Sequence, residues 1–302
     1  MKKSLLFCAV FILVSAFTTV FAQDPAMHGP PKVLYVVRED IKPGMMGAHN
    51  THSANYANVF RTLNTPNHRI ALVPVAGSEN EVVYVTGADS FKELEDMLAT
   101  TDKRMASASG NTKAELDRLD KEAPVLHAGM RDMLTVYRAD LSYNPNVDIR
   151  AMRYFSINTV RIRPGHDAQY VDYVQKMINV ARQKAKVDNL HLAFFQVVSG
   201  APNGTYLVFR PMKSLAEMDD PIGVRVRAAM GDDMRKDADK AISDAIMTGE
   251  TSTYAFAPNM SFVDKDMIAA DPAFWTPKPA MMVKPKPKKK VVKAAAAPAP
   301  TD

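Results

Sequence analysis

Ile41-Lys42-Pro43-Gly44 and Ile162-Arg163-Pro164-Gly165 are two copies of one short motif, and the fold of this chain follows from them. Proline cannot donate to a sheet ladder and disfavours a helical residue before it, while glycine allows a tight turn into the next element. Apolar, β-rich residues precede both copies, and helical patterns follow them. The motif therefore predicts, twice in one chain, a strand that ends and a helix that begins.

The match between the two halves extends beyond this motif. Pro43 and Pro164 lie 121 residues apart, and further identical pairs have offsets of 122 (Asn67/Asn189, Tyr84/Tyr206), 124 (Ser90/Ser214) and 119 (Ser142/Ser261). Loop insertions produce small drifts of this kind. A repeat this long indicates a duplicated domain, because solenoid repeats span only about 20 to 50 residues.

Both halves are expected to contain the same elements in the same order. In the first half, the patterns predict strands over 33–39, 69–75, 81–86 and 131–138, and a helix over 44–63. Ser90 with Glu93, and Ser214 with Glu217, are matching capping boxes that start helices, and a further helix from Thr112 is kinked or ended by Pro124. The second half ends with a strand over 251–257. This is the ferredoxin-like split βαβ order with one connection lengthened.

The second strand of each half is apolar on both faces, as in Ile70-Ala71-Leu72-Val73 and Leu192-Ala193-Phe194-Phe195. A sheet with one solvated face alternates between apolar and polar residues, so both faces of these sheets are expected to be buried. Helices would cover one face, and the sister sheet would cover the other.

This combination of element order, strand-Pro-Gly-helix motif and duplication resembles the dimeric α+β barrel superfamily, which includes antibiotic-biosynthesis-monooxygenase-like and NIPSNAP-like domains. The resemblance covers about Lys32 to Asp264. It implies an α+β fold in which two tandem ferredoxin-like repeats, 32–148 and 149–264, form an intrachain dimeric α+β barrel. The superfamily contains cofactor-free oxygenases, haem-handling enzymes and proteins without known activity. No catalytic motif matches, so the catalytic residues stay unknown and the question of enzyme activity stays open.

The amino terminus has the pattern of a secretory signal peptide over residues 1–22. Lys2 and Lys3 precede an apolar run over 5–14, and the small residues before Gln23 predict cleavage after Ala22. The protein is therefore expected to be secreted or periplasmic, and a retained amino-terminal anchor is the alternative. Cys8, the only cysteine, lies in this segment. A mature chain without a thiol excludes disulfides, thiolate metal ligands and cysteine nucleophiles.

The positive charge of the chain belongs to its ends. The formal net charge is +5, and it becomes −2 when Lys2, Lys3 and the tail from Val283, with its six lysines and one aspartate, are left out. A nearly neutral body makes nucleic acid an improbable partner. The Lys/Pro/Ala-rich segment 265–302 is predicted to be a disordered tail. The alternative is an electrostatic tether to an anionic envelope surface.

His49 and His52 stand out on the first predicted helix. In the second half the same stripe is apolar and contains Tyr170, Tyr173 and Val174. Two imidazoles one turn apart share a helix face, so they could bind a metal or haem, or act as acid and base. The alternative is a pair of ordinary histidines at a helix edge. Because no carboxylate stands at a recognised ligand spacing, we expect no metal and no cofactor, with haem as the alternative.

Arg69 and His191 precede the second strand of each half and are interpreted as equivalent residues. If their face looked into the barrel, they would form a polar pocket in an apolar wall together with Tyr35, Asn158 and Tyr84. Solvated strand ends are the alternative, and Tyr84 and Tyr206 are typical packing aromatics. The scattered methionines indicate core packing rather than a soft-metal site.

These observations predict a secreted or periplasmic barrel protein, a monomer or homodimer, that binds a small apolar or aromatic ligand or acts as an envelope-associated binding module. The alternative is a monooxygenase-like or haem-handling enzyme of the dimeric α+β barrel type.

Overall fold

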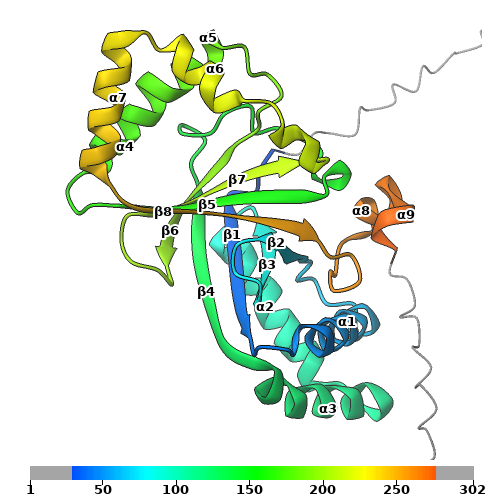
Figure 1. Cartoon of the computed structure of the whole chain (residues 1–302). Coiled ribbons are helices and arrows are strands. Elements are labelled where there is room, and N and C mark those ends of the chain that lie inside the picture. The colour runs from blue at the N-terminus through cyan, green and yellow to red at the C-terminus, as the bar shows by residue number, and fades with distance from the viewer. Residues whose placement is uncertain (1–28, 277–302) are drawn as a thin grey trace, which may run out of the picture.

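The computed structural model describes residues 29–276, so the predicted signal peptide and residues 277–302 of the predicted tail lie outside it. Within these residues, strands close into one barrel in the order β1-β3-β2-β8-β5-β7-β6-β4 (Figure 1). The strands are β1 Val33–Ile41, β2 Ile70–Ala76, β3 Glu81–Ala88, β4 His127–Tyr137, β5 Tyr154–Ile162, β6 Ala193–Ser199, β7 Thr205–Met212 and β8 Ile246–Phe256.

Each half of the chain supplies four consecutive strands of this barrel, in the ferredoxin-like order. Two antiparallel seams join the halves, one between β2 and β8 and the other between β4 and β6. This confirms the predicted α+β class and the intrachain dimeric α+β barrel built from tandem ferredoxin-like repeats. We call the two halves repeat one and repeat two.

The inside of the barrel is filled by apolar side chains from both repeats. Phe155 and Phe195 lie against Phe209, with ring centroids 5.3 and 5.6 Å apart, and Leu72 and Leu207 are fully buried beside them. Alternate residues of each strand face outward and pack under helices. Both faces of the sheets are therefore buried, as the doubly apolar strands predict.

Helices cover the outside of the barrel in two groups, one for each repeat (Figure 1). Repeat one has α1 Met46–Leu63, α2 Phe91–Ala106 and α3 Gly110–Leu126, and repeat two has α4 Asp167–Asp172, a π-helical segment Tyr173–Ile178, α5 Asn179–Lys184, α6 Ile222–Ala229 and α7 Asp232–Ala245. Both capping boxes form: Ser90 Oγ accepts from Glu93 N at 3.1 Å, and Ser214 Oγ accepts from Ala216 N at 3.0 Å. The Ser214 box starts a 3-10 turn, Leu215–Met218, and Pro124 lies in the last turn of α3.

β4 and β8 begin four and five residues earlier than predicted, directly where α3 and α7 end. Their first residues include exposed apolar side chains such as Met130 and Met247. A strand whose start projects into solvent lacks the alternation that a half-buried strand shows, so the sequence pattern misses it.

The strand registers correct two of the predicted equivalences between the repeats. Tyr84 pairs with Val37, whereas Asn158, which corresponds to Val37 at the offset of 121, pairs with Val208. The counterpart of Tyr84 is therefore Val208, and the match with Tyr206 is wrong.

The second correction concerns Arg69. Arg69 forms a bridge with Phe262, and the equivalent bridge in repeat two joins Leu192 to Tyr143. Arg69 thus corresponds to Leu192 and not to His191. Loop residues inserted between strands change the sequence offset between equivalent positions of the two repeats. A match between identical residues therefore does not by itself identify equivalent positions.

The folded body extends past the predicted start of the tail. Residues 265–276 contain two short helices, α8 Lys265–Ala270 and α9 Pro272–Trp275. Trp275 packs against Phe256 of the barrel core, and its Nε1 donates to the Arg150 carbonyl oxygen at 3.0 Å. Trp275 thus anchors the start of a segment whose overall composition is typical of a disordered tail. No helix in the described part of the chain is both long and apolar enough to cross a membrane.

Candidate functional site

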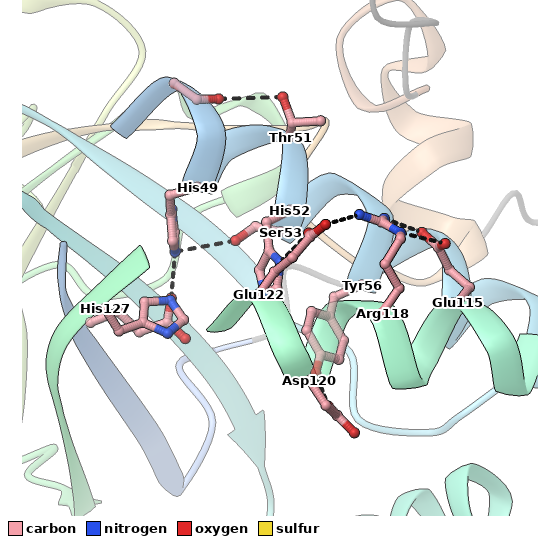
Figure 2. Close-up of polar contacts among 12 residues, drawn as sticks. His49, Thr51, His52, Ser53, Tyr56, Glu115, Arg118, Asp120, Glu122 and His127 are labelled. Atoms are coloured by element: carbon pink, nitrogen blue, oxygen red, sulfur yellow. Dashed lines mark hydrogen bonds and ion pairs between the residues drawn. The ribbon is translucent and has the colours of Figure 1, made fainter. Parts of the chain in front are cut away.

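A cluster of ionisable side chains lies between α1 and the outward face of repeat one. His49 and His52 come from α1, and His127 is the first residue of β4 (Figure 2). Glu39 is on β1. His49 Nε2 lies 2.7 Å from Glu39 Oε2, and His127 Nε2 lies 3.5 Å from the same oxygen. The His127 ring centroid is 5.1 Å from that of His49 and 6.0 Å from that of His52. We call these four residues the histidine cluster.

The local fold explains why these residues meet. Side chains alternate along β1, so Glu39 faces outward like Val37 and Ile41, which pack beneath α1. Pro43 ends the strand, and Gly44, at φ +79°, turns the chain back so that α1 lies over it. The register of β1 and β4 shifts where His127 lies opposite Ile41, which brings the His127 ring to the amino-terminal part of α1.

The two helix histidines are almost completely buried, with 0% of His49 and 3% of His52 exposed. Nδ1 of His49, Nε2 of His52 and Nε2 of His127 are buried and have no hydrogen-bond partner within residues 29–276. A buried polar atom without a partner costs about 1–3 kcal/mol. These three nitrogens therefore lack, within the described residues, the hydrogen bonds that would offset their burial.

The electrostatics of the cluster keep Glu39 ionised. Burial raises the pKa of Glu39, but the hydrogen bond from His49 and the positive charges of His49, His127 and Arg69 outweigh it, so this pKa is lowered overall. Burial lowers the pKa of His127, and the charge of Glu39 only partly opposes that effect. A metal ion needs an ionised carboxylate and an imidazole nitrogen without a proton, and the lowered pKa values of Glu39 and His127 both favour these states.

Arg69 and Tyr84 border the cluster. The Arg69 guanidinium lies 4.7 Å from the Phe60 ring centroid and 4.5 Å from that of Tyr84. The Tyr84 hydroxyl and Ser53 Oγ are 2.6 Å apart. Burial, followed by the charge of Glu39, raises the pKa of Tyr84, so the hydroxyl stays neutral.

A surface hollow of about 630 Å³ lies between α1 and α3, next to the histidine cluster. We call it the helix groove. His52 lines it, and His52 Nδ1 faces Glu122 Oε2 of α3 at 3.4 Å. Apolar and charged side chains complete the lining: Ala48, Thr51, Asn55, Arg118, Lys121, Glu122, Val125 and Leu126.

The structure brings together four of the seven residues singled out from the sequence: His49, His52, Arg69 and Tyr84. They meet outside the barrel, beneath α1, because the inward positions of β2 and β3 hold Leu72 and Val83 instead. The expected pocket inside the barrel does not form.

The other three residues lie elsewhere. The Tyr35 hydroxyl donates to Asp132 at 2.8 Å. Asn158 lies on the side of β5 that faces the repeat-two helices, because its neighbour Ile157 faces the barrel interior. His191 bonds to the Asn144 carbonyl oxygen at 2.8 Å and lines a second hollow, of about 500 Å³.

Glu39 and His127 are the site residues that the sequence interpretation missed. Each belongs to a strand rather than to a recognisable motif, and 88 positions separate them. The duplication carries the signal that could have found them. At the offsets of 121 and 119, their counterparts in repeat two are the apolar residues Val160 and Ile246.

Glu39, His49 and His127 are the described residues whose ligand atoms could hold a metal ion, since these atoms all lie within 4.8 Å of one another. Of the predicted pair, His49 belongs to this group and His52 does not. Haem fits less well, because His49 is fully buried and bonded to Glu39, which leaves no slot for a porphyrin beside it. His52 lines the helix groove, but charged side chains share that lining.

The chain is similar in fold to several solved structures. An anthrone oxidase-like protein is 12% identical, with a TM-score of 0.46 over 75% of this chain and 92% of that protein. A mutant chlorite dismutase from Candidatus Nitrospira defluvii is 9% identical, with a TM-score of 0.44 over 76% of this chain and 92% of the other. A NIPSNAP family protein of unknown function from Agrobacterium tumefaciens is 19% identical, with a TM-score of 0.26 over 35% of this chain and 88% of its own.

The likeness is one of fold. At such identities it says nothing about activity. No protein-family model and no curated protein sequence matches the chain.

Proposed function

We propose that the protein is a secreted or periplasmic binding protein that takes a small apolar or aromatic molecule into the helix groove. The observation that carries this proposal is the position of His52. Its ring lines the groove, and its buried Nε2 lacks a hydrogen-bond partner within the described residues. Polar groups placed beside apolar side chains in one concavity are typical of ligand sites.

The lining of the groove supports this ligand class. Val125 is 58% exposed although it is a large apolar residue, and Ala48 and Leu126 extend the same apolar wall. The edge-on contact between His52 and Tyr56, with ring centroids 5.1 Å apart, adds aromatic surface next to it. Since the barrel interior is filled, the groove is the better candidate for the binding site.

Titration with the aromatic probe 1-anilinonaphthalene-8-sulfonate tests the proposal. Wild-type protein should bind one equivalent with enhanced fluorescence, and Val125→Asp should weaken binding about tenfold or more because it puts a charge on the apolar wall, equivalent to about 1.4 kcal/mol. Val224→Asp is the matched control, since Val224 is an exposed valine on α6 of repeat two. Equal affinity in Val125→Asp and wild type, or equal loss in both variants, would contradict the proposal.

The alternative enzyme of the haem-handling or monooxygenase-like type predicts a different result. Haemin titration would then give a Soret shift that His52→Ala weakens. We expect no specific shift, because a porphyrin would have to displace the side chains of Glu122 and Arg118. Arg118 Nη1 donates a hydrogen bond to Glu122 Oε1 at 2.5 Å.

Export and the role of the tail are proposals from the sequence. Amino-terminal sequencing of protein recovered outside the cytoplasm should begin at Gln23, and a product that still starts at Met1 would favour the retained anchor. Retention on anionic vesicles should fall when the chain is truncated at Val283 if the lysine-rich tail acts as a tether. Unchanged retention would exclude that role.

A further inference from the structure

We propose that Glu39, His49 and His127 form a binding site for a divalent transition-metal ion. The site lies beside the helix groove but does not depend on a ligand in it. Two imidazoles and one carboxylate are a ligand set that Zn²⁺ and Fe²⁺ accept.

The geometry is close to that of a coordination site. Metal–nitrogen and metal–oxygen distances of roughly 2.0–2.2 Å in a tetrahedral arrangement put neighbouring ligand atoms about 3.4 Å apart. His127 Nε2 already lies 3.5 Å from Glu39 Oε2, and His49 Nε2 lies 2.7 Å from the same oxygen. Small side-chain movements would make room for an ion among these three atoms.

The burial of the cluster points to a ligand as well. Nε2 of His127 is buried and has no hydrogen-bond partner among the described residues, and it lies 3.5 Å from Glu39 Oε2. At His49, which is 0% exposed, an ion would replace the proton shared between Nε2 and Glu39. Metal coordination would give His127 Nε2 the partner that it lacks within the described residues.

Repeat two shows what the same framework contains without such a site. The start of the first helix is built in the same way in both repeats: His49 N donates to the Met45 carbonyl oxygen, as Tyr170 N donates to that of His166. His127 lies opposite Ile41 at a register shift, and Ile246 lies opposite Ile162 at the same kind of shift.

The three counterparts of Glu39, His49 and His127 are therefore Val160, Tyr170 and Ile246. Val160 and Tyr170 are buried in the core of repeat two, and Ile246 packs against them. The fold requires only apolar packing at these positions. The three polar residues in repeat one are thus the exception, and they are the three residues whose ligand atoms converge.

Zn²⁺ and Co²⁺ binding to the purified full-length mature protein tests the proposal. We expect one equivalent of Zn²⁺ by isothermal titration calorimetry, and a Co²⁺ complex with visible absorption bands of a four- or five-coordinate site. His127→Gln should weaken binding about 100-fold or more, because loss of even an outer-shell partner costs 10–100-fold. The control variant His191→Ala, which changes a half-buried histidine outside the cluster, should bind as tightly as wild type.

The triple variant Glu39→Val/His49→Tyr/His127→Ile introduces the apolar residues found at the equivalent positions of repeat two. Because the same framework accommodates these residues in repeat two, the variant is expected to fold. It should keep the far-ultraviolet circular dichroism of the wild type and lose the high-affinity site. Retention of one tight equivalent in the folded triple variant would overturn the proposal, as would weakening in His191→Ala equal to that in His127→Gln. Because the anilinonaphthalene titration probes the groove separately, failure of one proposal is distinguishable from failure of the other.

Discussion

The hydrogen bond between Ser53 and Tyr84 shows at the scale of single residues how repeat one keeps polar groups under its first helix. The two side-chain oxygens are 2.6 Å apart, and both residues are buried. Their counterparts in repeat two are Val174 and Val208, which belong to the apolar core there. Ser53 Oγ also lies 3.4 Å from His49 Nε2, so removing the Ser53 hydroxyl takes one partner from Tyr84 and one from His49.

Ser53→Ala is expected to lower the free energy of unfolding by about 1–2 kcal/mol, because a buried hydroxyl that loses its partner costs about that much. Adding Tyr84→Phe should cost less than it does in the wild-type background, since the two changes remove one shared interaction. Urea unfolding of the two single variants and the double variant measures the coupling. Strictly additive values would show that the two hydroxyls do not act together.

At the scale of elements, a few side chains attach the short helix α9 to the barrel. Trp275 is 1% exposed, packs against Phe256 and lies 4.9 Å, centroid to centroid, from Phe274. Arg153 stacks on Phe274 at 3.9 Å and forms an ion pair with Asp271. One buried indole and one arginine thus hold this short segment against the barrel.

Trp275→Ala should lower the free energy of unfolding by about 3–5 kcal/mol, because it empties a large site in the core. Phe91→Ala is the comparison, since this aromatic residue is exposed on α2 and should change stability by no more than about 0.5 kcal/mol. Thermal or urea unfolding of both variants provides the measurement. Similar values for the two variants would mean that α9 is only loosely attached.

The elements differ in how well the sequence predicts them. The strand-Pro-Gly-helix motifs and capping boxes locate α1, α2 and their counterparts because these signals are local. The starts of β4 and β8 and the helix α9 depend on packing between distant segments, so local patterns miss them. The candidate site divides in the same way: His49 and His52 share a helix face and are predictable, whereas Glu39 and His127 join them only through sheet register.

At the scale of the whole molecule, the two seams make the repeats interdependent. β2 finds its second partner in β8, and β4 finds its second partner in β6. A repeat on its own would expose two strand edges and the inward apolar face of its sheet. The barrel is therefore expected to be one cooperative unit.

Urea unfolding should accordingly show a single transition, with the same midpoint by far-ultraviolet circular dichroism and by tryptophan fluorescence. Trp275 is the only tryptophan of the chain, so fluorescence reports on its contacts with the barrel, while circular dichroism reports on both repeats. Two separate transitions, or midpoints that differ between the probes, would indicate that the repeats unfold independently.

Two copies of one unit in one chain allow one copy to maintain the barrel while the other holds an unusual cluster. The most direct test of this division is anomalous X-ray diffraction at the zinc absorption edge from crystals of the protein grown with Zn²⁺. The account predicts one strong peak within coordination distance of Glu39, His49 and His127, and none among Val160, Tyr170 and Ile246. A map without a peak at the first position, or with comparable peaks at both, would contradict it.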